Sequence, residues 1–345
     1  MTGETTDGLS ARAVSATVAD LLAETRTGRA QSVGRMQVLP LLAGDGPCAD
    51  LGDPGELAIT TSAYGTLDFR NDTATAVLVP CHLAVVVRQA AQDHAMPRAV
   101  VVRPGEGLVY PHAMCVQETQ GGLIRGGRHR LAILPPPLRE AAADLPVRPE
   151  FDRLWPAVRA FNHSAGLPTT GNLVAFLRRF ATELDRFVAE FECVAEQVGA
   201  IVLIDGEVAG IERAPSPAYW RTLWEPLIRF CYGAEAVRRE AAGVPAGLGT
   251  RVALGSVGGE RDAVAPADLA GNLAALAAAV RAADAREQAL VDTAAAAARA
   301  TPVLAGVDTT VDGIAVGSVD APGFVGAYAL HGDRPVYASL TARAA

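Results

Sequence analysis

The sequence predicts an α+β protein, and three patterns carry that prediction. Residues 36–137 contain short β-branched runs separated by Gly, Pro, Asp and Asn clusters, which is typical of an all-β layer. After Pro149 the apolar period becomes that of a helix. Paired β runs return at residues 200–212 and 324–340. We therefore expect a β-rich N-terminal half packed against a helical C-terminal half with β-hairpins.

The same patterns divide the chain into three parts. Residues 1–34 contain one short helical pattern and are predicted to form an N-terminal helical tail. Residues 35–145 make up the β-rich half, and residues 146–345 make up an α+β half. Because β runs occur on both sides of this boundary, the two halves can share a sheet and form one structural unit.

Local signals predict particular elements in the second half. Residues 151–161 carry apolar side chains on one helical face, and residues 173–191 are predicted to form one long core helix. Asp205-Gly206 lies between two β runs and predicts a type I′ hairpin turn. A later helical pattern contains Pro226, which predicts a kink or break there.

Composition and charge restrict the classes of partner. The chain has 345 residues, is 50% hydrophobic and carries a formal net charge of -8, so it offers no basic field to nucleic acid. No run reaches the roughly 18 apolar residues expected of a membrane span. The N-terminus also lacks the pattern of a secretory signal. The five cysteines are odd in number and widely spaced, which favours reduced thiols in a cytoplasmic protein.

The stretch from Leu67 to Glu118 places polar, potentially reactive side chains between apolar β runs. Its thiols and imidazoles belong to Cys81, His82, His94, His112 and Cys115. These groups can bind a transition metal, but residues 81 and 82 point to opposite faces of a strand, and this spacing argues against a shared metal site. A thiol nucleophile with a histidine base is the second interpretation. Buried thiols and hydrogen-bonded histidines without a catalytic role are the third.

Carboxylates and glycine-rich segments add further candidate groups. The carboxylates of Asp68, Asp72, Asp93, Glu106 and Glu118 can supply an acid/base pair, or lie in turns as solvated residues. Gly44–Gly46 and Gly255–Gly259 are glycine-rich, yet neither has the pattern of a Walker A loop or a dinucleotide fingerprint. Residues 121–130 place Arg125, Arg128 and Arg130 among glycines, either to bind an anionic ligand or as a solvated loop.

Five segments, in order, carry a family resemblance: VGRMQVLPLLAGDG (33–46), LDFRNDTATAVLV (67–79), VVVRPGEGLVYPHAMCVQ (100–117), QVGAIVLIDGEVAGIE (197–212) and FVGAYALHGDRPVYASL (324–340). Together they resemble the ARG and rhodanese-phosphatase-superfamily-associated protein domain of the first type. That resemblance implies a link to NAD-derived or ADP-ribose-like molecules. The link comes from the company of the family's genes and not from a site.

The chain departs from the family pattern at several polar positions. Where the family has a Gly-Glu-Glu-Leu type segment, this chain has Pro80-Cys81-His82-Leu83. The family's Lys-Gln-Asn-Arg becomes Arg88-Gln89-Ala90-Ala91, and its Cys-Val-Glu becomes Cys115-Val116-Gln117. A histidine usual near the C-terminal strand corresponds to Tyr337. If those groups carry the family's activity, this member has lost it or exchanged it for another.

The leading hypothesis is a protein that binds a small polar, anionic or nucleotide-like ligand. Its predicted ligand-binding residues are Arg88, Gln89, Arg125 and Arg128, and its candidate catalytic residues are Cys115, His112 and His82. The sequence identifies no cofactor. An enzyme with Cys/His or metal-based chemistry is one alternative. A non-catalytic scaffold protein that self-associates as a homo-oligomer is the other.

Overall fold

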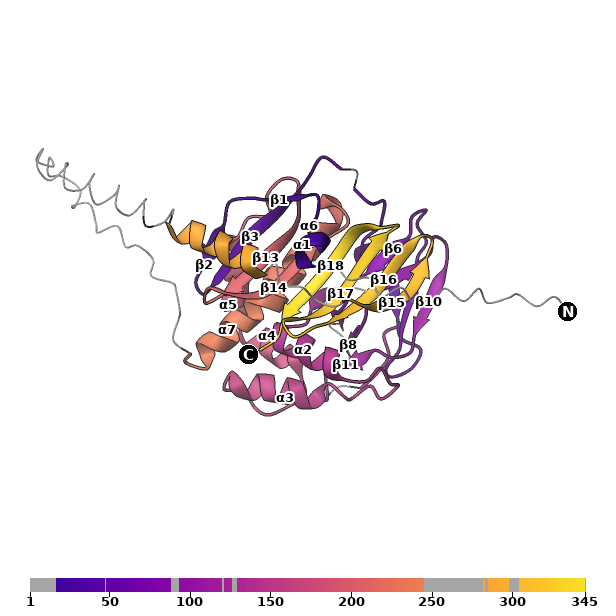
Figure 1. Cartoon of the computed structure of the whole chain (residues 1–345). Coiled ribbons are helices and arrows are strands. Elements are labelled where there is room, and N and C mark those ends of the chain that lie inside the picture. Colours follow the sequence, from indigo (N-terminus) through magenta and orange to yellow (C-terminus); the bar gives the residue numbers. More distant parts are fainter. Residues whose placement is uncertain are drawn as a thin grey trace, which may run out of the picture.

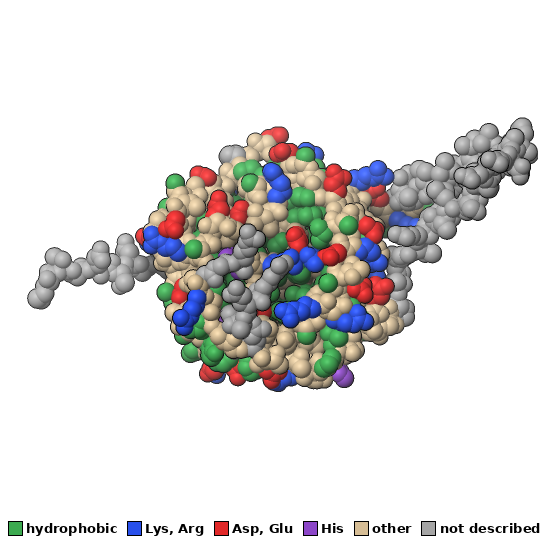
Figure 2. All heavy atoms as spheres, turned by 180° about the vertical axis from the view of Figure 1, so that it is seen from behind, with side chains coloured by type: hydrophobic (Ala, Val, Ile, Leu, Met, Phe, Trp, Pro, Cys, Tyr) green, Lys and Arg blue, Asp and Glu red, His purple; other side chains and the backbone are tan. Residues whose placement is uncertain are grey.

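The computed structural model describes residues 17–46, 48–87, 93–119, 121–125, 129–244, 282, 285–297 and 304–344. It confirms the α+β class, with antiparallel sheets and helices in one assembly (Figure 1). In these ranges no helix is both long enough and apolar enough to cross a bilayer. Acidic and basic side chains are interspersed on the described surface that Figure 2 shows.

A nine-stranded antiparallel sheet forms the centre of the molecule. Its main path runs β1-β3-β13-β14-β18-β17-β16-β15, and β2 also pairs with β3. The strands are β1 (Thr25–Thr27), β2 (Gln31–Val33), β3 (Met36–Ala43), β13 (Gln197–Ile204), β14 (Glu207–Arg213), β15 (Leu304–Val311), β16 (Ile314–Asp320), β17 (Phe324–His331) and β18 (Arg334–Ala342). Because β3 lies between β1 and β13, strands from both sides of residue 146 share this sheet.

Both faces of the central sheet are buried, and β13 shows how. Ala200, Val202 and Ile204 belong to the larger hydrophobic core, whereas Ile201 and Leu203 belong to a second cluster. This alternation follows from the two-residue period of a strand. The second cluster also contains residues of α1 (Val18–Leu21) and of the helix formed by residues 285–297.

The predicted hairpin turn between β13 and β14 is confirmed. Asp205 and Gly206 have φ angles of 58° and 85°, the left-handed values that a type I′ turn requires at both central positions. Gly206 supplies such an angle without a Cβ penalty, and Asp is among the residues that tolerate it. The local sequence therefore sets the register between these two strands.

Smaller sheets pack beside the central one and carry most of the polar stretch. A four-stranded sheet has the order β11-β8-β7-β12, a three-stranded sheet the order β10-β5-β4, and β6 pairs with β9. Their bounds are β4 (Ala58–Thr60), β5 (Leu67–Arg70), β6 (Val77–Val79), β7 (Leu83–Val87), β8 (His94–Ala95), β9 (Val100–Val102), β10 (Gly107–Tyr110), β11 (Met114–Cys115) and β12 (His129–Ile133), with a 3₁₀ turn η1 at Pro54–Glu56.

The helices that follow β12 differ from the prediction in one place. They are α2 (Pro136–Asp144), α3 (Trp155–Ser164), α4 (Leu173–Arg179), α5 (Ala181–Glu190), α6 (Pro217–Glu225) and α7 (Gly233–Ala241). The single helix predicted for residues 173–191 is wrong, because the chain bends at Phe180, whose φ and ψ are -107° and 25°. The Phe180 ring lies 4.8 Å from the ring of Phe176, and apolar periodicity alone does not report this bend.

The sequence predicts a kink or break at Pro226, and the helix changes type at this residue. The segment η2 (Pro226–Tyr232) is a π-helix between α6 and α7. Proline removes a backbone donor and crowds the preceding turn, and π-helical turns are frequent near functional sites. The result is that Phe230, Cys231 and Tyr232 are all buried in the interior.

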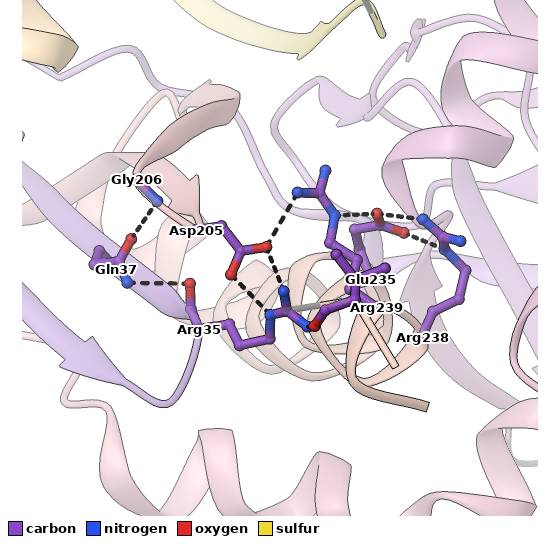
Figure 3. A network of polar contacts seen from close by, with 8 residues as sticks. Arg35, Gln37, Asp205, Gly206, Glu235, Arg238 and Arg239 are labelled. Atoms are coloured by element: carbon purple, nitrogen blue, oxygen red, sulfur yellow. Dashed lines mark hydrogen bonds and ion pairs between the residues drawn. The ribbon is translucent and has the colours of Figure 1, made fainter. Parts of the chain in front are cut away.

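An ion-pair network joins the β13–β14 turn to α7 (Figure 3). The guanidinium of Arg35 donates to both carboxylate oxygens of Asp205, at 2.7 and 2.9 Å. Arg239 bridges Asp205 and Glu235, and Arg238 donates to both oxygens of Glu235. Bidentate pairs of this kind fix geometry as well as adding energy. They hold the end of α7 against the sheet.

Candidate functional site

Four residues were predicted to bind the ligand, and the structure describes one of them. Arg125 is exposed, whereas Arg88, Gln89 and Arg128 lie outside the described residues. Their described neighbours are close together, because Val87 at the end of β7 pairs with His129 at the start of β12.

Asp93 is the buried carboxylate at this end of the four-stranded sheet. Its Oδ1 accepts the backbone N–H of Val87 at 2.8 Å, and its carbonyl oxygen accepts the N–H of Val116 at 3.0 Å. The residue is 0% exposed, and Oδ2 has no hydrogen-bond partner among the described residues. Of the five carboxylates considered from the sequence, Asp93 alone is buried.

The buried environment of Asp93 destabilises the ionised form of its carboxyl. Burial raises the pKa of its carboxyl to about 7, although the hydrogen bond from Val87 and the charge of Arg178 both oppose the shift. Arg178 lies exposed on α4. A carboxyl that titrates near neutral pH can act as an acceptor or as a donor, and such groups are enriched at functional sites.

Cys115 lies next to Asp93 but is not activated as a nucleophile. It is fully buried, and burial raises the pKa of its thiol to about 11, with the nearby Asp93 carboxylate adding to the shift. Its cross-strand neighbour is His94, whose Nε2 accepts the N–H of Gly65 at 3.1 Å. That nitrogen is therefore engaged elsewhere. A thiol in this setting stays protonated at neutral pH.

His112 is placed apart from these groups. It lies in the turn before β11, with its ring edge-on to Tyr110 at 6.0 Å, and its carbonyl oxygen accepts from Arg153 Nη2 at 2.6 Å. Among the described residues, no hydrogen bond, ion pair or ring contact joins His82, His112 and Cys115 to one another. Likewise, no three His, Cys, Asp or Glu side chains in the described ranges are arranged to hold a metal ion.

His82 belongs to a different buried polar network, centred on Arg139 of α2. The Arg139 side chain is 0% exposed and donates to Glu212 Oε1 at 2.6 Å and to Ser339 Oγ at 2.6 Å. It also donates to Tyr232 OH at 3.2 Å and to His82 Nδ1 at 3.3 Å. Burial alone would lower the pKa of Arg139, but Glu212, Tyr232 and Cys231 together outweigh it and raise the pKa well above its usual value.

The contact with Arg139 also determines the protonation of His82. Burial and the Arg139 charge hold the pKa of the imidazole well below its usual value, so the ring is neutral. Because Nδ1 accepts from Arg139, the ring proton is on Nε2. Nε2 has no acceptor among the described residues. His82 also has a φ of 62°, a left-handed value that costs a non-glycine residue about 1 kcal/mol or more.

Three of the positions where this chain departs from the family pattern, Cys81, His82 and Tyr337, meet in or beside this network. Tyr337 accepts the backbone N–H of Cys81 at 3.0 Å through its hydroxyl. Burial raises the pKa of the Cys81 thiol to about 12 and that of the Tyr337 hydroxyl well above its usual value. A histidine and two acidic residues at these positions would bring new charges to the same interior. The three departures are therefore physically coupled.

Sequence reasoning missed the groups around His82. Arg139, Glu212, Tyr232 and Ser339 were not among the candidate residues, although each contacts this network. For two of these residues, the sequence contained a signal that could have identified them. Glu212 directly follows the apolar residues Val208–Ile211, and Arg139 sits in an alanine-rich helix next to Leu138. A charged residue inside an apolar run points to a buried partner.

The comparisons with known proteins agree with the sequence resemblance. Residues 24–250, more than half of the chain, match the model described as the ARG and Rhodanese-Phosphatase-superfamily-associated Protein domain. No significant match was found among curated proteins or among solved structures.

We expect Arg139→Met to be strongly destabilising. The substitution leaves Glu212 buried without its counter-charge, which costs about 3–5 kcal/mol of unfolding free energy. Adding Glu212→Gln should recover part of the loss, since the leftover charge is then removed. Urea unfolding measures both. Arg70→Met is the control, because Arg70 and Asp72 form an exposed pair. A loss in Arg139→Met no larger than in the control would contradict the ion-pair argument.

The raised pKa of Asp93 predicts a pH-dependent stability. The folded-state pKa of about 7 exceeds the usual 3.8, so the folded state holds the proton more tightly and stability falls as pH rises between these values. The full effect is about 4 kcal/mol. Asp93→Asn removes this penalty, so its stability relative to wild type should increase between pH 5 and pH 8. Asp72→Asn, at an exposed position, should show no such trend. A pH-independent difference for Asp93→Asn would refute the shift.

The cysteines should differ sharply in reactivity. Cys48 is exposed, whereas Cys81, Cys115 and Cys231 are buried. Iodoacetamide should label Cys48 in the native protein, and the three buried thiols only after denaturation, because alkylation requires an accessible thiolate. Peptide mass spectrometry locates each label, and Cys48→Ser should remove the fast reaction. Rapid native labelling of Cys115 near pH 7 would instead support a thiol nucleophile.

Proposed function

The chain belongs to the ARG and rhodanese-phosphatase-superfamily-associated protein family, and from that premise we propose that it binds a small polar ligand rich in hydroxyl and phosphate groups. ADP-ribose and related nucleotides have this chemistry. The proposed site is the end of the four-stranded sheet where Val87, Asp93 and His129 lie.

Asp93 is the observation that carries the proposal. A wholly buried carboxylate with one unpartnered oxygen destabilises the fold, because that oxygen has lost its hydrogen bonds to water and gained none within the protein. A ligand hydroxyl would supply the missing hydrogen bond. Carboxylates accept the hydroxyls of ribose in this way in dinucleotide-binding proteins. The burial of Asp93 therefore supports a ligand that brings its own donor.

The charge around Asp93 supports the phosphate part of the proposal. Arg178 is close enough to act on the Asp93 carboxyl, and Arg125 is exposed in the segment between β11 and β12. Arginine is suited to phosphate because its planar guanidinium donates two parallel hydrogen bonds. Arg88, Gln89 and Arg128 keep their proposed role as recognition groups, and Cys115 is proposed to line the site.

The catalytic roles of His82, His112 and Cys115 remain predictions. His82 would act from the Arg139 network, and Cys115 from beside Asp93, so any shared chemistry would require a ligand that reaches both. The enzyme and scaffold interpretations also remain open alternatives.

Addition of ADP-ribose or NAD in saturating amounts should raise the melting temperature of the full chain, because a ligand that binds only the folded state stabilises it. Asp93→Asn should weaken the affinity about ten-fold or more, since one charged hydrogen bond contributes about 1.5–3 kcal/mol. Affinity should also rise from pH 6 to pH 8, as the carboxyl near pKa 7 becomes a better acceptor.

Asp72→Asn and Arg70→Gln are matched controls on an exposed ion pair and should bind like wild type. Affinity is compared by calorimetry, because Asp93→Asn changes the melting temperature by itself. Absence of binding by every nucleotide tested, or equal affinity in wild type and Asp93→Asn, would refute the proposal.

A further inference from the structure

A small pocket whose lining does not include Asp93 lies at one end of the central sheet's β14 and β18. It is bounded by Glu24 and β1, the loop after β3, the end of β14 and the start of β18. Its volume is about 30 Å³, and it is partly open to solvent. This is room for about two water-sized groups. The pocket therefore fits a small ion, or the charged end of a larger molecule, but not a nucleotide.

Arg213 is the buried charge of this pocket. It is 7% exposed, and its Nη1 donates to the carbonyl oxygens of Leu21 and Ala23, each at 2.7 Å. No carboxylate of the described residues forms an ion pair with it, and none of these residues accepts a hydrogen bond from its Nε or Nη2. Burial lowers the pKa of Arg213, and the charge of Arg334 lowers it further, while Glu24 opposes the shift. The guanidinium thus lacks a full counter-charge.

Arg334 adds a second guanidinium at the same pocket. Its Nε pairs with Glu24 Oε2 at 2.6 Å, and its side chain is 30% exposed. Two guanidiniums and the one lining carboxylate leave one positive charge uncompensated. Asp45 is exposed in the adjoining loop but does not line the pocket. An anion with oxygen acceptors would balance the charge and use the remaining donors.

The glycine pair after β3 explains how the loop comes so near these charges. A Cβ on Gly44 would overlap the carbonyl oxygen of Glu24, which accepts the Gly44 N–H at 2.9 Å. A Cβ on Gly46 would lie 2.8 Å from Arg334 Nη2 and 3.0 Å from Glu24 Oε2. At Gly44 a side chain would collide with backbone, and at Gly46 it would displace the Arg334 and Glu24 side chains, so both glycines permit the close approach. The two glycines of the segment Gly44–Gly46 help to shape this pocket, although the segment does not have the pattern of a nucleotide-binding loop.

We propose that this pocket binds a small oxyanion, either a free phosphate ion or the carboxylate of an organic acid, between Arg213 and Arg334. The site is separate from the ligand site proposed at Asp93. Its recognition chemistry is the pairing of guanidinium donors with oxyanion acceptors, which is strongest where water is partly excluded.

The test is a titration of the full chain with sodium phosphate and, separately, with sodium acetate, each compared with sodium chloride at equal ionic strength. Calorimetry and melting temperature are both recorded. One of the two oxyanions should bind saturably and raise the melting temperature, and the comparison identifies which. Arg334→Gln should weaken this binding about ten-fold, because it removes one charged donor. Arg334→Glu should abolish it.

Two variants separate this site from others. Arg70→Gln changes an exposed arginine elsewhere and should leave oxyanion binding unchanged. Asp93→Asn should also leave it unchanged, so a failure of the nucleotide proposal is distinguishable from a failure here. Gly46→Ala should weaken binding by displacing the Arg334 side chain. If neither oxyanion binds beyond the chloride control, or if Arg334→Glu binds as well as wild type, the proposal is overturned.

Discussion

The charge of Arg139 must be neutralised inside the protein, and this requirement determines how several segments meet. Arg139 comes from α2, Glu212 from β14, Tyr232 from the π-helix and Ser339 from β18. A buried guanidinium without such partners would cost several kcal/mol. The ion pair therefore does more than join two residues. It specifies which face of α2 and which turn of the π-helix face the central sheet.

The Asp93 region differs, because there the acidic group itself keeps a buried oxygen without a partner among the described residues, whereas in the Arg139 network the unpartnered atom is Nε2 of the neutral His82. Around Arg139 the guanidinium has a carboxylate and several hydrogen-bond partners, whereas Asp93 keeps one buried oxygen without a partner in the described structure. Interiors usually avoid that arrangement. The unpartnered oxygen lies at one end of β7, and the Arg139 ion-pair network lies near the other end. The stabilising polar core is therefore separate from the candidate binding end.

Much of the fold could be predicted from sequence, and the limits have physical causes. The Asp205-Gly206 hairpin was predictable because its backbone angles depend on two adjacent residues. The bend at Phe180 was not, because it depends on how Phe176 and Phe180 pack in three dimensions. The candidate site, too, could be predicted from sequence only where local signals were sufficient. The sequence identified Asp93, Cys115 and His82 as polar residues in an apolar frame, but their partners come from distant segments. Glu212 and Ser339 become neighbours only through strand pairing.

The position of β3 in the central sheet has a consequence for biosynthesis. Its residues pair with β13, so that Pro40 lies opposite Ala200, about half the chain further on. During translation, β3 leaves the ribosome long before its partner exists. Its apolar residues and open backbone edge are then exposed, a state that favours association with other chains. The edge of β3 that faces β13 therefore stays without its partner until the second half of the chain has been synthesised.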